Sequence, residues 1–147
     1  MPISVPRAVI DGTFGQLRRC GDGRRECVAY WYGPLDEPGR VTDWVHPSHT
    51  SSAAGYEVDT SWVTSFFLDL RRRRETARVQ VHTHPRLASH SDVDDEFALA
   101  PATGFVSLVI PNFALGPAGL DGTHVVVVQP DGTWLAVPPM EVLAIAS

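Results

Sequence analysis

Polar and apolar residues alternate with the two-residue period of a β-strand in several short stretches of the chain. The stretch 78–84 alternates in this way and predicts a central strand, which must end at Pro85 because proline has no backbone N–H to donate. The stretch 104–111 is almost continuously apolar, as is typical of a strand buried on both faces. The other predicted strands are residues 3–10, 26–32, 41–45, 124–128 and 134–137.

A helical period is strongest after Thr60, which is a suitable N-cap. The apolar positions that follow form one core-facing stripe: Trp62, Val63, Phe66, Phe67 and Leu70. Shorter helices are predicted after Asp11, over 92–100 and over 140–145. The arginine run 71–74 is interpreted as the solvated last turn of the main helix, and 46–56 and 112–122 as loops.

This order of elements predicts an α/β (α+β) fold in which a mixed sheet is flanked by helices. The 147 residues are expected to form a single domain, 1–147, because a chain of this length can bury roughly 70% of its unfolded surface in one core. Neither an internal repeat nor a low-complexity linker divides the sequence.

The net charge of −5 argues against a nucleic-acid backbone as partner, and no stretch of about 18 apolar residues predicts a membrane span. The sequence also lacks a leading apolar segment with a basic start and a cleavage site, so we expect a reducing cytoplasmic location. In that compartment Cys20 and Cys27 are interpreted as free thiols, with Cys27 buried beside Glu26.

Two histidines lie where the central strand ends. His82 and His84 are two residues apart, so their side chains are expected on the same face. Asp94 follows ten residues after His84, on the first turn of the predicted helix. Two imidazoles and one carboxylate suit zinc and leave a fourth tetrahedral position for water. A surface role is the ordinary alternative for a histidine, and a H-x-H pair alone indicates metal only weakly.

The stretch His82-Thr83-His84-Pro85, followed by Ser91-Asp92-Val93-Asp94, resembles the H-x-H-P…S-x-x-D signature of the JAB/MPN+ (JAMM) zinc metalloproteases. Members of this family cleave ubiquitin and ubiquitin-like proteins at isopeptide or peptide bonds. The resemblance implies the MPN fold, Zn²⁺ bound by His82, His84 and Asp94, and a catalytic Ser91 that donates to the oxyanion. Ser91 is also a suitable N-cap for the following helix.

The family also uses a glutamate on an early strand. Glu26 heads a segment similar to the family's E-x-x-G-x-x-x-G strand, with Ala29 where a glycine is common. Glu26 is therefore expected to be the catalytic general base that moves a proton from water to the departing amine. Its rivals are Glu57 and Glu75. Without the histidine motif, an exposed charge beside two arginines would be the preferred interpretation of Glu26.

Some assignments stay open. Ser89 to Asp92 also reads S-x-x-D, at a shorter distance from Pro85, and Asp92 and Asp95 are fallback metal ligands. An EF-hand beginning at Asp92 fails because it lacks the required glycine and glutamate. A Cys–His peptidase lacks a recognisable activating context for either cysteine. The remaining histidines are interpreted as loop or edge residues, with His90 near enough to touch substrate: His46, His49, His90 and His124.

The residues of the motif most resemble those of stand-alone prokaryotic members of the family. Some of these members are encoded beside ubiquitin-activating and ubiquitin-conjugating (E1/E2-like) homologues in antiphage operons. The resemblance therefore implies a deubiquitinase-like enzyme whose substrate is a ubiquitin-like protein or its conjugate. One alternative is a metal-free MPN scaffold that binds other subunits. Another is a metallopeptidase acting on a different peptide, such as a peptidoglycan stem peptide, or on a small carrier protein.

Overall fold

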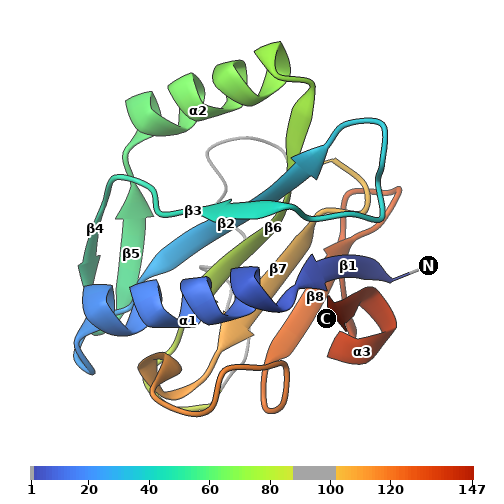
Figure 1. The fold of residues 1–147 in the computed structure, drawn as a ribbon. Coiled ribbons are helices and arrows are strands. Elements are labelled where there is room, and N and C mark those ends of the chain that lie inside the picture. The colour runs from blue at the N-terminus through green and yellow to red at the C-terminus, as the bar shows by residue number, and fades with distance from the viewer. Residues whose placement is uncertain (1, 88–101) are drawn as a thin grey trace.

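A six-stranded mixed sheet with the strand order β3-β2-β6-β7-β8-β9 organises the molecule (Figure 1). The computed structural model describes residues 2–87 and 102–147, so the predicted helix over 92–100 lies outside the described residues. Only β6 and β7 pair in parallel within this sheet, and its other neighbours are antiparallel. In chain order the strands are β2 (Val28–Pro34), β3 (Asp43–Val45), β6 (Glu75–Thr83), β7 (Val106–Ile110), β8 (His124–Val128) and β9 (Trp134–Val137).

Two small two-stranded sheets complete the β-structure. The first pairs β1 (Ile3–Pro6) in parallel with β10 (Leu143–Ala146), which brings both ends of the described chain together. The second is a hairpin of β4 (His49–Ser52) and β5 (Gly55–Val58). The helices are α1 (Arg7–Gly21), α2 (Thr60–Arg72), α3 (Pro139–Val142) and the short 3-10 helix η2 (Asn112–Ala114).

Helix α1 packs on one face of the large sheet and forms the main core there. Its buried positions Ile10, Phe14 and Leu17 recur at helical spacing and contact alternate residues of the strands. Trp31 projects from β2 toward this helix and donates its indole N–H to the hydroxyl of Thr13 over 2.8 Å, with both residues fully buried. Burial of the indole N–H is therefore compensated by a hydrogen bond.

Helix α2 packs on the opposite face, as the alternation of side chains along β2 requires. Tyr30, the neighbour of Trp31, points to this side and lies 6.1 to 6.4 Å, ring centre to ring centre, from three aromatic side chains of α2. Burial among them raises the pKa of Tyr30 to about 12. The predicted aromatic stripe of this helix is thus a packing surface: Trp62, Phe66 and Phe67.

The predicted mixed sheet flanked by helices is confirmed, with four local corrections. Helix α1 begins at Arg7 and is longer than expected, and Asp59 caps α2 in place of Thr60 by accepting from the backbone N–H of Ser61 over 3.0 Å. The segment 46–56, predicted as a loop, contains β4 and the start of β5. The segment 140–145 is helical only to Val142 and then forms β10.

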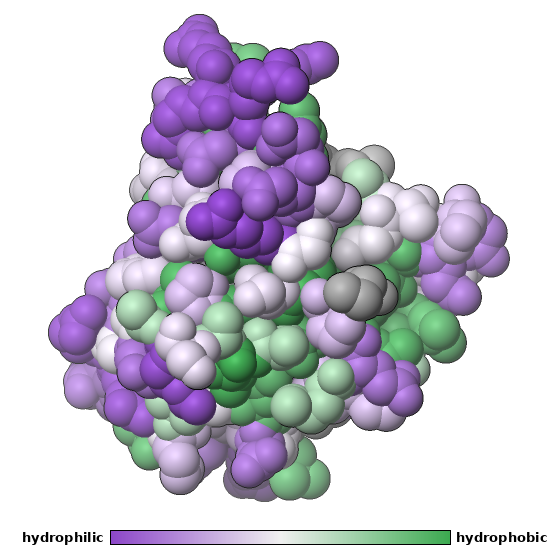
Figure 2. Space-filling view, turned by 45° about the vertical axis from the view of Figure 1, so that its right-hand side comes forward, coloured by the Kyte–Doolittle hydropathy of each residue, from purple (hydrophilic) through white to green (hydrophobic). Residues whose placement is uncertain are grey.

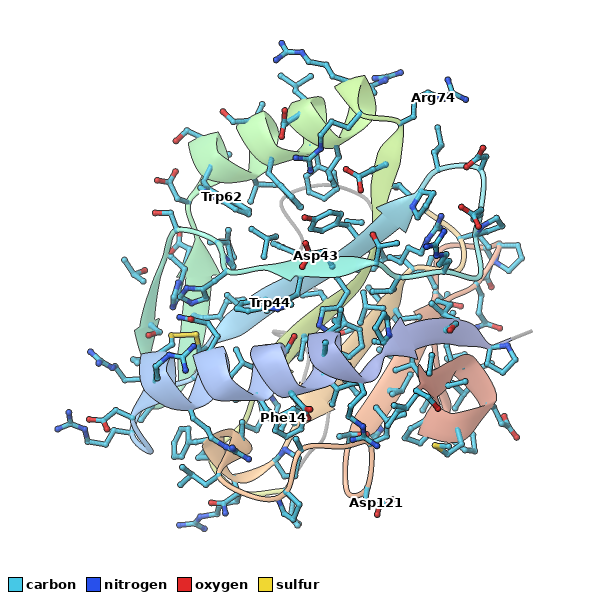
Figure 3. The ribbon with its side chains drawn as sticks, viewed as in Figure 1. Phe14, Asp43, Trp44, Trp62, Arg74 and Asp121 are labelled. Atoms are coloured by element: carbon cyan, nitrogen blue, oxygen red, sulfur yellow. A yellow bond between two sulfur atoms is a disulfide. The ribbon has the colours of Figure 1, made fainter. Side chains whose placement is uncertain are left out.

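The end of α2 forms the most polar region of the surface in Figure 2, at the top of the molecule. The arginine run begins inside the last turn of the helix, as expected, and Arg74 lies beyond it with a φ of 57° (Figure 3). Arg73 forms ion pairs with Asp69 and Glu75. Within residues 2–87 and 102–147, no helix is both long enough and apolar enough to cross a bilayer.

Gly33 allows the chain after β2 to approach its own sheet closely. A Cβ atom added at this position would lie 2.2 Å from the carbonyl oxygen of Arg40, which belongs to the backbone and cannot rotate away. That carbonyl in turn accepts a hydrogen bond from Arg78 of β6 over 3.0 Å. The second glycine of the E-x-x-G-x-x-x-G pattern is therefore needed because a side chain at this position would collide with the backbone of Arg40.

We expect Gly33→Ala to lower the free energy of unfolding by roughly 1–3 kcal/mol, the usual penalty for overpacking. Gly55→Ala is the matched control, because it is also a strand glycine and an added Cβ there has no neighbour within 4 Å. Urea denaturation of both variants measures the difference. Equal stability of the two variants would contradict the close approach at Arg40.

Candidate functional site

The two motif histidines come together at the end of β6. His82 pairs with Val28 of β2 on one side and with Val109 of β7 on the other, so it occupies the centre of the sheet. Its side chain is almost completely buried, with 1% of the residue exposed. The ring centres of His82 and His84 lie 5.1 Å apart, as expected for side chains two positions apart on one face.

Glu26 lies beside these histidines because the pairing of β2 with β6 extends to the residues that precede the first residue of β2. The backbone N–H of Cys27 donates to the Thr83 hydroxyl over 2.9 Å, and the Thr83 N–H donates to the Cys27 carbonyl over 3.0 Å. The preceding residue, Glu26, therefore projects to the same face as His84. Its Oε1 lies 3.9 Å from His84 Nε2, and Glu26 is 6% exposed. The structure thus excludes the interpretation of Glu26 as an exposed charge.

The backbone of His84 is fixed by the last residue of β7 and by the turn that follows it. Its N–H donates to the Ile110 carbonyl, and its carbonyl accepts from the Phe113 N–H, both over 2.9 Å. The three residues of η2 all have positive φ values between 52° and 62°, although none is glycine. Left-handed backbone at such residues is strained and persists only where surrounding contacts hold it. This turn replaces part of the loop predicted over 112–122.

The β4–β5 hairpin adjoins the same face of the sheet. The Ser52 carbonyl accepts from the Glu26 N–H over 2.8 Å, which fixes the hairpin beside the start of β2. Tyr56 of β5 accepts a hydrogen bond from the side chain of Gln80, and its ring lies 5.3 Å from that of His82. The hairpin is therefore attached to the site by backbone and by side chain.

His124 also faces this side of the sheet, which the sequence did not indicate. Val109 of β7 pairs with His82 on one side and with His124 of β8 on the other. Residues paired across neighbouring strands project to one face. The order of the strands, which the sequence alone did not provide, is what places His124 there.

The other predicted site residues fall into two groups. Asp94 and Ser91 lie outside the described residues, as do Ser89, His90, Asp92 and Asp95. The rival carboxylates are described and lie elsewhere. Glu57 of β5 is exposed, and Glu75 begins β6 at the end opposite His82, where it pairs with Arg73 over 2.8 Å. Of these three carboxylates, Glu26 is the one that the structure brings to the histidines.

The described part of the site fits a zinc ion. Two imidazoles converge from one strand end, and a buried carboxylate stands beside them, so the donors are of the types that zinc prefers in catalytic sites. His82 and His84 would supply two nitrogen ligands. A third protein ligand would have to come from the segment that contains Asp94.

A second group of side chains that could hold a metal ion lies around Cys27, on the face of the sheet opposite Glu26. Cys20, Cys27, His46 and His49 each offer one ligand atom, and these atoms all lie within 4.8 Å of one another. The two cysteines form a disulfide, so the prediction of free thiols is wrong. In Figure 3 this bond is drawn in yellow beside the end of α1. Burial, and then the neighbouring His49, lower the pKa of His46 below its ordinary value.

No protein-family model matches the sequence. The chain is similar to the probable metalloprotease y4jG of Sinorhizobium fredii, with 32% identity over 143 residues that cover 92% of this chain and 87% of the relative.

Two solved structures share the fold. Protein DSY2949 of Desulfitobacterium hafniense superposes with a TM-score of 0.65 at 14% identity, over 98% of this chain and 92% of that protein. AF2198, a JAB1/MPN domain protein of Archaeoglobus fulgidus, superposes with a TM-score of 0.55 at 12% identity, over 99% of this chain and 98% of that protein. The chain has the fold of JAB1/MPN domain proteins, and it belongs to the same family as the probable metalloprotease of Sinorhizobium fredii.

Proposed function

We propose that this protein is a zinc-dependent peptidase or isopeptidase that removes or processes a ubiquitin-like protein. The observation that carries the proposal is the buried carboxylate of Glu26, 3.9 Å from His84 and on the same face of the sheet as both motif histidines. A relative named a probable metalloprotease supports the peptidase activity. The proposed metal ligands are His82, His84 and Asp94.

When bound, zinc would supply Lewis-acid activation of water and of the scissile carbonyl. Glu26 would accept the proton of the attacking water and pass it to the departing amine. Its burial suits this role, because a carboxylate shielded from bulk water transfers its proton within the site. Ser91 is proposed to donate a hydrogen bond to the developing oxyanion.

The β4–β5 hairpin is the proposed wall of the substrate groove. An extended C-terminal tail, such as that of a ubiquitin-like protein, can bind by adding a strand to an existing β-structure. The hairpin is attached to the site at Ser52 and Tyr56, so a tail lying along it would pass close to Glu26 and His82. E1-like and E2-like proteins of a conjugation pathway, including an antiphage one, are the proposed partners.

We expect Glu26→Gln to lower the cleavage rate of a ubiquitin-like fusion by roughly 10²- to 10⁴-fold, because the amide cannot accept the proton. Its zinc content should equal that of the wild type. Glu75→Gln is the matched control, since it makes the same change on the rival carboxylate at the end of β6 opposite His82 and should keep full activity. Full activity of Glu26→Gln would remove Glu26 from the mechanism.

We expect a chelator to abolish cleavage, and added zinc to restore it in the wild type but not in His84→Ala. Elemental analysis after zinc-supplemented expression should find about one equivalent less zinc in His84→Ala than in the wild type. A metal-free scaffold predicts equal zinc in both proteins and no cleavage by either. Metal-dependent cleavage of other peptides, with all ubiquitin-like fusions left intact, would instead favour a different substrate class.

A further inference from the structure

The cluster of Cys20, Cys27, His46 and His49 is assembled from three separate segments. Cys20 lies in the last turn of α1, Cys27 immediately precedes β2, and the two histidines lie at the base of the β4–β5 hairpin. Glu26 and Cys27 are neighbours in the chain and project to opposite faces, so the cluster is distinct from the site around His84. Nothing in the proposed peptidase mechanism uses these four side chains.

The distances in the cluster are close to those of a tetrahedral metal site. Cys27 Sγ lies 3.1 Å from His46 Nε2 and 3.7 Å from His49 Nε2, while Cys20 Sγ lies 3.3 Å from His49 Nε2. Around a tetrahedral zinc ion, ordinary Zn–S and Zn–N bond lengths place sulfur and nitrogen roughly 3.5 Å apart. The sulfur–nitrogen distances therefore suit one ion already, whereas the two sulfur atoms of the disulfide must first separate to roughly 3.8 Å after reduction.

The hydrogen bond of His49 shows which of its nitrogens carries the proton. Nδ1 lies 3.0 Å from the Pro47 carbonyl oxygen, which can only accept, so Nδ1 is the donor. In the neutral ring the lone pair on Nε2 then faces the two sulfur atoms, and disulfide sulfurs have no hydrogen to donate to it. A backbone carbonyl on the far nitrogen is the usual partner of a metal-bound histidine.

His46 would have a corresponding arrangement only after its side-chain partner, Gln16, turns over. Its Nδ1 lies 3.3 Å from the side-chain amide of Gln16 and its Nε2 faces Cys27. Rotation of the amide by half a turn would present the Gln16 oxygen to an Nδ1–H, and Arg19 would then have to give up its exposed 3.1 Å hydrogen bond to that oxygen. Both histidines can therefore direct an Nε2 lone pair at the same point.

We propose that the reduced protein binds a zinc ion through Cys20, Cys27, His46 and His49, and that the disulfide is the metal-free, oxidised form of this site. A dithiol reductant gives two electrons and two protons to the disulfide, forming two thiols while it becomes a disulfide itself. Zinc then displaces the two thiol protons and binds both thiolates. Because all four ligands come from the protein, the site is structural.

Metal binding at this cluster would join the hairpin base to α1 and to the residue next to Glu26. Cys27 is fully buried, while the other three side chains are partly exposed and leave a path by which an ion can enter. The ligand spacings Cys-x6-Cys and His-x2-His differ from those of zinc fingers, because here the fold of α1 and the hairpin brings the ligands together.

Cobalt substitution tests the proposal in the full chain without measuring activity. The wild type is reduced by a dithiol, the dithiol is removed under anaerobic conditions, and Co²⁺ is then added to this sample and, separately, to the oxidised protein. We expect a sulfur-to-cobalt charge-transfer band in the reduced protein alone. A Cys₂His₂ site has thiolate ligands, whereas the proposed catalytic site has none, so the band reports only on the cluster.

Substitutions in the cluster and in the proposed catalytic site show which residues bind the cobalt ion. We expect the band to be lost in Cys20→Ser, and bound cobalt to fall by about one equivalent in both Cys20→Ser and His49→Gln. His84→Ala and the control His124→Gln should keep the band, so failure of the proposed catalytic site is distinguishable from failure of this one. Absence of the band from the reduced wild type, or a band of equal strength in the oxidised protein, would overturn the proposal.

Discussion

The antiparallel pairing of β2 with β6 is the constraint on which the site depends. Two hydrogen bonds between Cys27 and Thr83, one of them to the Thr83 hydroxyl, extend this pairing to the residue before the first residue of β2. Because side chains alternate between faces, that register determines that Glu26 lies beside His84 and that Cys27 faces away from it. A shift of one residue would exchange the two, so that a cysteine side chain would lie beside the imidazole and a carboxylate would lie in the core.

The sequence was sufficient where a signal is local. Two histidines that are two positions apart on one strand share a face in any fold. The distance of 5.1 Å between the ring centres of His82 and His84 agrees with that period. The mixed sheet was likewise predictable from the order of apolar segments. The Asp94 and Ser91 predictions lie outside the described residues and remain predictions.

The sequence was insufficient where residues meet through the fold. Cys20 and Cys27 have a spacing that fits no familiar metal motif, and His46 and His49 lie in a stretch of serine, threonine and histidine with no clear period. That polar stretch forms a hairpin because Ser52 and Tyr56 bind to neighbouring strands, which no local propensity encodes. Tertiary contacts therefore decided both the hairpin and the state of the cysteines.

The left-handed turn at η2 couples the first helix to the strand end that carries His84. Arg18 of α1 donates to the Ala114 carbonyl over 2.6 Å, and the same turn presents the Phe113 N–H to the His84 carbonyl. Left-handed backbone costs about 1–2 kcal/mol per ordinary residue, and the Arg18 guanidinium, which also donates to the Gly116 carbonyl, is one of the contacts that offset this cost. Through this turn, a side chain of the first helix helps to anchor the backbone of a residue that carries one of the two imidazoles.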